Sequence, residues 1–215
     1  MDQCNTKPSH GRLPKVEGEL GYYGLAEWWL SSFTEQEREY IETRYTPMGI
    51  GGTDNSRPLT RGQILDGGTG RASQLLWGLA TWFRKPEDFH IARRILAKAE
   101  EVAVDPRDFH FTYQGMIQLY YRMRDADPMA LDWAIDACGK QIRISFQVAE
   151  RMKSEYAGQP LPHHVGYTQL AVIREKQKNY AEAVRLAKQA KEQGWAGDWD
   201  KRIARCEKRA ATTRT

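Results

Sequence analysis

The chain has 215 residues, 40% of them hydrophobic, and a formal net charge of +4. This size and apolar content suit one domain with arms and suffice for a hydrophobic core. No run of about 18 apolar residues is present, so we expect no membrane span and no membrane partner. The three cysteines, Cys4, Cys138 and Cys206, are far apart, which favours free thiols in a reducing, cytoplasmic environment over a disulfide framework.

The first 47 residues are expected to form an arm followed by a helix pair. Residues 1–20 contain glycine and proline and lack the apolar run of a signal peptide, so we expect a flexible arm. Two helices should follow in residues 21–47, with the second running from about Glu35 to Tyr45.

Residues 48–70 form a glycine-rich connection, and a loop of this length in a compact domain is usually functional or mobile. We expect one helical turn over Leu59–Leu65, with Ile64 and Leu65 tucked under the helices that follow. The stretch Asp66–Ser73 brings glycine amides to a helix start, but it lacks the spacing and the Lys-Ser/Thr pair of a phosphate-binding loop. We interpret it as an entry loop.

Residues 71–210 show helical periodicity arranged as hairpins. Between His163 and Trp195, apolar and small residues recur at i, i+3, i+4 and i+7, which indicates two amphipathic helices and excludes strands. The residues that carry this pattern are Tyr167, Leu170, Ala171, Tyr180, Ala183, Ala187 and Ala190.

The same spacings recur at two earlier places in the chain. The clearer copy runs from Leu76 to Val104 and consists of Leu76, Leu79, Ala80, Phe83, Phe89, Ala92, Leu96 and Ala99. The poorer copy has Ile117, Tyr121, Ala130 and Ala137 at matching positions. A long helix is expected from Met129 to Tyr156 and a final helix from Trp199 to about Ala210, after which residues 211–215 should fray.

Capping signals mark several of the expected helix starts. Thr34 with Glu37, and Asn179 with Glu182, have the spacing of a capping box. Further candidate caps are Asp88, Asp108, Asp127 and Asp198.

The repeated pattern resembles the tetratricopeptide repeat over about residues 72–200. It departs from that family at Arg174, where a tyrosine is usual, and at Trp195, where a proline is common. The resemblance implies an all-α fold in which helical hairpins stack into an α-solenoid, preceded here by the N-terminal helix pair and the glycine-rich loop. The alternative is a non-repetitive helical bundle that obeys the same packing rules.

The resemblance also implies a binding surface, because the first helix of each hairpin in that family lines a concave face that holds a peptide or partner protein. The positions expected to face this groove are Gln74, Trp77, Thr81, Arg84, Thr112, Gly115, Leu119, Arg122, Thr168, Val172 and Glu175. Trp77 and Arg84 are the expected anchors, and Arg84 beside Arg122 favours an acidic segment or a free carboxylate. Alternatively, Trp77 packs under the N-terminal helix pair and the groove is filled internally.

Basic charge is concentrated at the C-terminal end. Residues Ala171–Thr215 include twelve lysines and arginines against six acidic residues, a net charge of +6, which leaves −2 for the rest of the chain. A basic stripe at helical spacing consists of Lys201, Arg202, Arg205, Lys208 and Arg209. This stripe is the expected contact if the chain binds nucleic acid, and a solvated outer face is the simpler interpretation.

Motifs for catalysis and metal binding are not found in the sequence. His163 and His164 are adjacent and should point to different faces, and His90 and His110 are isolated, so we expect no metal and no cofactor. No nucleophile motif is present, and we do not expect an enzyme. We therefore expect a non-enzymatic adaptor that binds a peptide or protein, with a nucleic-acid-associated protein and a regulatory subunit of an enzyme complex as alternatives.

Overall fold

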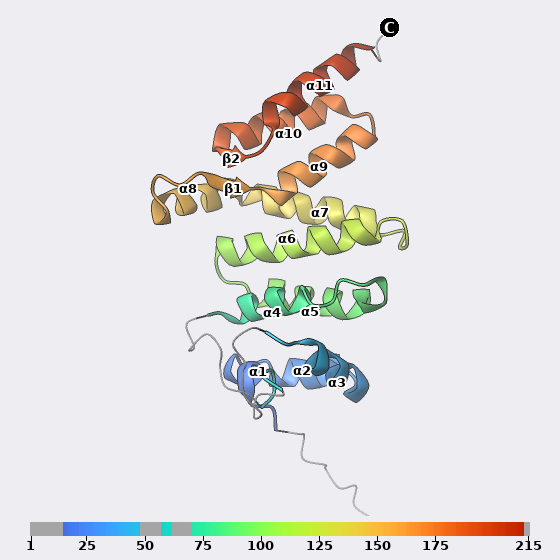
Figure 1. The fold of residues 1–215 in the computed structure, drawn as a ribbon, viewed down its shortest axis with the longest axis vertical. Coiled ribbons are helices and arrows are strands. Elements are labelled where there is room, and N and C mark those ends of the chain that lie inside the picture. Colours follow the sequence, from blue (N-terminus) through green and yellow to red (C-terminus); the bar gives the residue numbers. More distant parts are fainter. Residues whose placement is uncertain (1–14, 48–56, 62–69, 213–215) are drawn as a thin grey trace, which may run out of the picture. The chain divides into compact units, whose positions relative to one another are not determined.

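The computed structural model describes residues 15–47, 57–61 and 70–212, and the chain divides into two compact units, residues 1–69 and 70–215. The described residues form eleven α-helices, one 3-10 turn and two short strands (Figure 1). This mostly helical content agrees with the predicted all-α class. None of the described helices is both long enough and apolar enough to cross a membrane.

The first unit contains three short helices, α1 (Gly18–Tyr22), α2 (Ala26–Ser32) and α3 (Glu35–Arg44). The predicted helix pair is therefore corrected to three helices. The arm predicted for residues 1–20 also ends earlier than expected, because Leu20 in α1 is fully buried. The rest of that arm, residues 1–14, lies outside the described residues.

Helix α1 forms because it meets a turn that is distant in sequence. The backbone N–H of Glu17 donates to the carbonyl of Thr60 at 2.9 Å, and that of Leu20 donates to the carbonyl of Leu59 at 2.9 Å. Gly18 has φ +57°, and a Cβ there would lie 2.5 Å from the Pro58 carbonyl oxygen, so this close approach requires glycine.

The structure confirms one predicted feature of the first unit and describes only part of the segment that holds a second one. The capping box is confirmed, because the Glu37 N–H donates to Thr34 Oγ1 at 3.2 Å and the Thr34 N–H donates to the Glu37 carboxylate at 2.8 Å. Residues 57–61 form a turn within the glycine-rich connection. Ile64, Leu65 and the glycine amides before Gly70 lie outside the described residues.

The second unit is built from helical hairpins joined in chain order. Its elements are α4 (Ala72–Ala80), η1 (Pro86–Asp88), α5 (Phe89–Glu101), α6 (Pro106–Met123), α7 (Ala130–Arg143), α8 (Ser145–Glu155), β1 (Leu161–His163), α9 (Val165–Lys176), α10 (Tyr180–Gln193), β2 (Trp195–Ala196) and α11 (Trp199–Thr212). Three pairs pack as hairpins, α4 with α5, α6 with α7 and α9 with α10, and α11 packs on α10. The small residues at the crossing of the last pair, including Ala183, are fully buried as expected.

The single helix predicted from Met129 to Tyr156 is wrong. The chain bends at Ile144, which separates α7 from α8 and has φ −97° and ψ −1°. At this bend the Ser145 hydroxyl lies 2.7 Å from the Ile142 carbonyl and 3.1 Å from the Tyr167 hydroxyl. Helix α8 then packs against α6. Helical periodicity continues through both helices, so the local sequence pattern does not predict the bend. The bend instead coincides with the contact between Ser145 and Tyr167 of α9.

The cap of α6 is also corrected. The carboxylate of Asp105 accepts the N–H groups of Arg107 at 2.8 Å and Asp108 at 3.2 Å, and Pro106 is the first helical residue. Asp108, the expected cap, instead pairs with Arg71 at 2.9 Å. Burial by itself would raise the pKa of Asp105, but the backbone hydrogen bonds from Asp108 and Arg107 and the nearby Arg71 together lower it.

Two other predicted caps lie at or near the expected helix starts. Asn179 accepts the Glu182 N–H at 3.2 Å and caps α10. Asp127 accepts the Met129 N–H at 2.8 Å, although α7 begins slightly later than expected, at Ala130.

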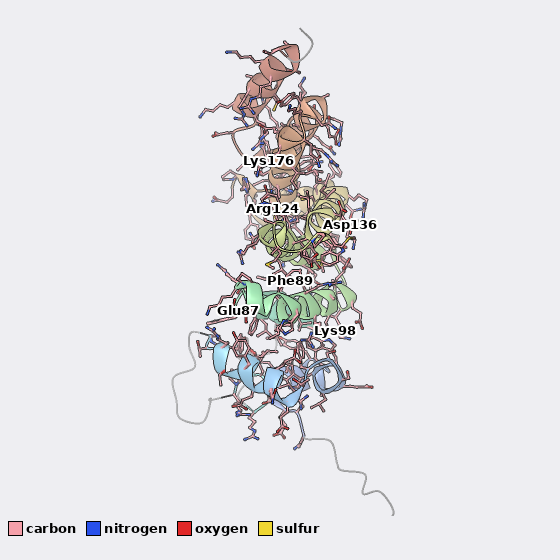
Figure 2. The ribbon with its side chains drawn as sticks, turned by 90° about the vertical axis from the view of Figure 1, so that its right-hand side faces the viewer. Glu87, Phe89, Lys98, Arg124, Asp136 and Lys176 are labelled. Atoms are coloured by element: carbon pink, nitrogen blue, oxygen red, sulfur yellow. The ribbon has the colours of Figure 1, made fainter. Side chains whose placement is uncertain are left out.

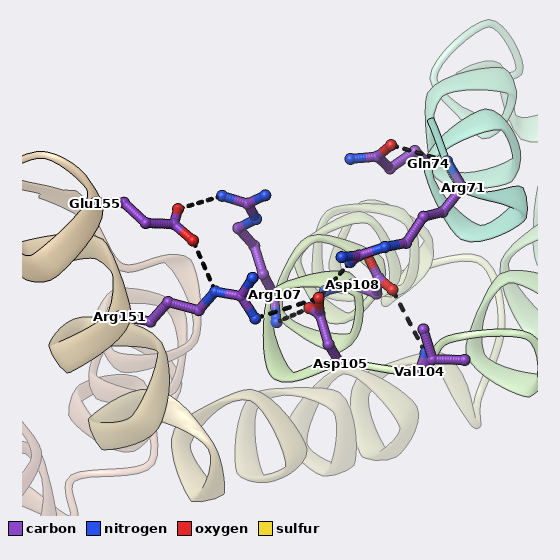
Figure 3. Close-up of polar contacts among 8 residues, drawn as sticks. All are labelled: Arg71, Gln74, Val104, Asp105, Arg107, Asp108, Arg151 and Glu155. Carbon is purple, nitrogen blue, oxygen red and sulfur yellow. Dashed lines mark hydrogen bonds and ion pairs between the residues drawn. The ribbon is translucent and has the colours of Figure 1, made fainter. Parts of the chain in front are cut away.

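A network of opposite charges joins the start of α6 to α4 and α8 (Figure 3). Arg151 in α8 pairs with Asp105 at 3.3 Å and with Glu155 at 2.8 Å. Arg107 pairs with the other oxygen of Glu155 at 2.5 Å. Positive and negative groups alternate in this cluster, so we assign it a structural role that anchors α8.

Helices α4, α6 and α9 lie side by side and run in the same direction (Figure 1). Near the starts of α6 and α9, the rings of His110 and His164 are 5.1 Å apart. Near their ends, the Lys176 ammonium donates to the Tyr121 hydroxyl at 3.0 Å. Arg124 also lies over the Tyr121 ring at 4.4 Å, on the same edge as Lys176 (Figure 2).

The second helices of the first two hairpins, α5 and α7, also contact each other. Phe89 at the start of α5 (Figure 2) stacks on Trp133 of α7 at 6.4 Å. Farther along the same two helices, Lys140 pairs with Glu100 at 3.0 Å. Helices α5 and α7 are therefore also parallel.

A buried aromatic junction explains the tryptophan at position 195. The Trp195 ring stacks on His110 at 5.7 Å and 9°, and strand β2 pairs in parallel with β1 next to it. His164 is fully buried and accepts the Tyr167 N–H through Nδ1, whereas His163 is exposed, so the two histidines point apart as predicted. Burial lowers the pKa of His164 to about 2 and that of His110 to about 4, so both rings are neutral.

The buried amide of Gln141 joins three helices, and this generates a first prediction. Its Nε2 donates to the His110 carbonyl of α6 at 2.9 Å, and its Oε1 accepts the Gly166 N–H of α9 at 2.6 Å. Gln141→Met should lower the free energy of unfolding by about 1–3 kcal/mol, because buried polar groups lose their partners. Chemical denaturation measures this, with the exposed Gln147→Met as the control; equal stability of the two variants would refute the role of the amide.

A second prediction concerns Ala183, which is fully buried in α10. Ala183→Trp should destabilise the unit by about 1–3 kcal/mol or more, because overpacking at a helix crossing forces the backbones apart. A thermal melt compares it with Ala181→Trp, an exposed position of the same helix. An unchanged melting temperature for Ala183→Trp would show that the crossing is not tightly packed.

Candidate functional site

Helices α4 and α6 enclose a small pocket of about 40 Å³ between their C-terminal halves. The lining includes six of the residues predicted to face the groove, namely Trp77, Thr81, Arg84, Gly115, Leu119 and Arg122. We call this site the α4–α6 pocket. It is the place where the structure brings the sequence-predicted residues together.

The indole of Trp77 forms one wall of the α4–α6 pocket. It is half-buried and stacks on Phe111 of α6, with ring centroids 5.4 Å apart and an interplanar angle of 26°. Its buried Nε1–H has no acceptor among the described residues. Phe111 was missed by the sequence analysis, because the repeat pattern contains no signal for an aromatic partner at that position.

Two exposed guanidinium groups stand at the rim of the same pocket. Arg84 Nε donates to the Thr81 carbonyl at 2.8 Å, and Arg122 Nη1 donates to the Arg84 carbonyl at 2.9 Å. Both side chains are therefore oriented by main-chain oxygens, which carry only partial charge. Apolar walls beneath two such groups suit a carboxylate attached to an apolar stem.

Two of the other predicted groove residues on α4 and α6 have different surroundings. Gln74 is turned toward the start of α4, where its Oε1 accepts the Arg71 N–H at 3.0 Å. Thr112 is fully buried, so its predicted place on the groove is wrong. It belongs to the stripe of α6 that also buries Met116, Leu119 and Met123, which recur at helical spacing.

A second and wider depression, the α9–α11 cleft, has a volume of about 560 Å³. Its lining includes the predicted Thr168, whose hydroxyl lies 2.7 Å from His163 Nε2, together with Arg202 and Arg205. Val172, also predicted to face the groove, is partly buried in α9.

Glu175 is held by the C-terminal helix. Its side chain is 10% exposed and accepts hydrogen bonds from Arg202 and from Nε and Nη2 of Arg205, the latter at 3.1–3.2 Å. Arg209 lies at 3.9 Å. Burial raises the pKa of Glu175, but Arg205 and Arg202 outweigh it and lower the pKa below its usual range. Glu175, which was predicted to face the groove, therefore pairs with three arginines that were predicted to contact nucleic acid.

The remaining members of the basic stripe are also distributed around α11. Lys201 lies 3.8 Å from Asp198, and Lys208 is exposed beside a shallow cavity that Tyr180 also lines. On the edge toward α10, acidic residues of α11 pair with lysines, Asp200 with Lys191 and Glu207 with Lys188. The positive charge of the stripe is thus partly neutralised.

The described residues hold no group of three His, Cys, Asp or Glu side chains placed to bind a metal ion. Cys138 and Cys206 are buried free thiols, and burial raises the pKa of Cys138 to about 12, which disfavours a reactive thiolate. Comparisons of the chain with family models, curated proteins and solved structures found no match. The candidate site is therefore defined by its own geometry.

The Glu175 cluster generates a third prediction. Glu175→Gln should destabilise the packing of α11 by about 1–3 kcal/mol, because Arg202 and Arg205 lose their shared carboxylate. Since the folded-state pKa of Glu175 is lowered, its contribution is complete above the ordinary value of 4.5 and is lost as the pH falls through the folded-state pKa.

The measurement is the free energy of unfolding of both proteins as a function of pH. The matched control is Glu182→Gln, which removes a carboxylate paired with the exposed Arg185 in the same helix and should change little. A difference between wild type and Glu175→Gln that does not depend on pH would show that the charge of Glu175 is not the cause.

Proposed function

We propose that this chain is a non-enzymatic adaptor that holds an acidic segment of a partner protein in the α4–α6 pocket. In this proposal, the hairpins of the second unit act as a tetratricopeptide-like solenoid, and α4, α6 and α9 are its inner helices. The support for this arrangement is that the first helices of successive hairpins are parallel neighbours, as are α5 and α7.

One observation carries the proposal more than any other. Arg84 and Arg122 are exposed, adjacent and oriented by main-chain carbonyls, and no described carboxylate pairs with either of them. Most of the other described arginines of the second unit have acidic partners within the chain, for example Arg71, Arg151 and Arg205. A carboxylate from another molecule would give this pair an equivalent partner.

The walls of the pocket add selectivity for a peptide. An apolar side chain next to the carboxylate would contact Trp77 and Leu119. A carboxylate that Arg binds by two hydrogen bonds is oriented as well as attracted. The ligand class we propose is therefore an acidic or C-terminal carboxylate beside an apolar residue.

A fourth prediction tests this function by titrating the full chain with fluorescein-labelled Glu-Glu-Glu-Leu, with a free C-terminus. Combining Arg84→Gln with Arg122→Gln should weaken binding at least tenfold, because charge-assisted hydrogen bonds are lost. The melting temperature should stay unchanged, since both side chains are exposed. Arg143→Gln, an exposed arginine at the end of α7, is the matched control.

The outcome that would reject the proposal is binding that is undetectable in the wild type or equally weakened by Arg143→Gln. Equal loss would show only general attraction between a basic protein and an acidic probe. A peptide with an amidated C-terminus separates recognition of the terminal carboxylate from that of the glutamate side chains.

Nucleic-acid association through α11 is the less supported alternative. Three of its arginines converge on Glu175, so fewer cations are available to phosphates than the stripe suggests. Binding of a single-stranded RNA that falls steeply with salt, and that is lost when Lys201 and Lys208 are replaced by Gln, would favour this alternative.

A further inference from the structure

The first unit carries a polar pocket of about 190 Å³ that the proposed function does not use. It lies where α2 and α3 meet the turn formed by residues 57–61. Its lining combines an aromatic ring, Trp29, an apolar side chain, Leu30, and several charged groups, of which Glu42 is the most deeply buried.

Glu42 has one satisfied and one unsatisfied carboxylate oxygen. Glu42 is 4% exposed, and its Oε1 accepts a hydrogen bond from the Thr60 hydroxyl at 2.5 Å. The buried Oε2 has no hydrogen-bond donor among the described residues. Burial raises the pKa of Glu42, which expresses the cost of holding a charge there. A buried oxygen of this kind attracts an N–H donor strongly.

Most of the cations that line the pocket are already engaged elsewhere. Arg57 donates to both oxygens of Glu39, at 2.6 and 2.5 Å. Arg38 donates to the carbonyls of Leu30, at 3.3 Å, and of Phe33. Lys15 pairs with Glu17, and Arg61 is exposed at the rim. Oε2 of Glu42 is therefore a buried acceptor in this lining to which no described group donates.

The rest of the lining fits the stem of a cationic side chain. Trp29 lines the pocket although it is only 2% exposed, and it offers an apolar aromatic contact there. Leu30 offers an apolar contact for methylene groups. The volume is well above the roughly 10–15 Å³ that one water needs, so a single water would not fill it.

We propose that this pocket binds the basic end of an alkyl-ammonium or alkyl-guanidinium ligand, such as a lysine or arginine side chain. The cation donates to Glu42 Oε2 and lies against Trp29, and its stem passes Leu30. Neutral and anionic ligands leave Glu42 without a partner and are excluded.

The test is a calorimetric titration of the full chain with Nα-acetyl-arginine-N-methylamide, Nα-acetyl-lysine-N-methylamide and the neutral isostere Nα-acetyl-citrulline-N-methylamide. The two cations should bind, and the citrulline probe should bind at least tenfold more weakly. Glu42→Gln should reduce binding of both cations at least tenfold. Glu27→Gln, an exposed glutamate on α2, should leave it within twofold.

Folding is monitored separately by a thermal melt and by circular dichroism. Glu42→Gln removes a buried charge and should melt at the same temperature as wild type or above it. If Glu42→Gln proves unstable, the wild-type pH profile replaces it: affinity for both cations should fall on acidification through the raised pKa of Glu42. The other charged groups that line the pocket shift this midpoint without removing it; they are Lys15, Glu35, Arg38, Glu39, Arg57 and Arg61.

The proposal is overturned if wild type binds neither cation at about 10 mM, or if the citrulline probe binds as tightly as the arginine probe. The first result would show that water or Arg61 satisfies Glu42, and the second that charge is not recognised. Free n-butylammonium, compared with the blocked lysine, separates a small metabolite-like amine from a peptide side chain. None of these outcomes depends on Arg84 and Arg122, so this proposal and the adaptor function fail independently.

Discussion

The second unit depends on the buried amide of Gln141. This side chain reaches from α7 to the His110 carbonyl of α6 and to the Gly166 N–H of α9, so it sets the register among the three helices. Gly166 is needed at this point, because a Cβ would lie 2.7 Å from Gln141 Oε1. Amide hydrogen bonds of this kind are directional, whereas apolar contacts alone would allow the helices to slide. The parallel arrangement of α6 and α9 is consistent with this register.

Internal pairing of charges then determines which charged groups of α4, α6 and α9 lack an oppositely charged neighbour in the described structure. At the starts of α4 and α6, Arg71 is bound by Asp105 and Asp108, and at the end of α9, Glu175 is bound by the arginines of α11. The α4–α6 pocket differs because its two rim arginines contact only main-chain carbonyls. A basic stripe read from the sequence is therefore a weaker guide to binding than two arginines whose acidic partners are missing from the described fold.

The two proposed sites have opposite chemical preferences. In the second unit, cations at the rim of an apolar pocket favour a carboxylate. In the first unit, the buried Glu42 beside Trp29 favours a cation. Both sites combine charged groups with an aromatic side chain in the lining, and charge complementarity contributes selectivity in addition to affinity. A partner segment that contains both acidic and basic residues would meet the requirements of either unit.

The sequence by itself determined the helical class, most helix positions and several helix starts. Hydrophobic periodicity and caps such as Thr34 with Glu37 depend on residues within one or two turns, so they are readable locally. Six residues that the repeat resemblance placed on one side of the helices also line the α4–α6 pocket. Only the tertiary structure decided the bend at Ile144, the burial of Thr112, the capture of Glu175 and the unsatisfied oxygen of Glu42. Each of these depends on a partner at least 18 residues away in the chain or on how neighbouring helices are rotated, and local periodicity contains neither.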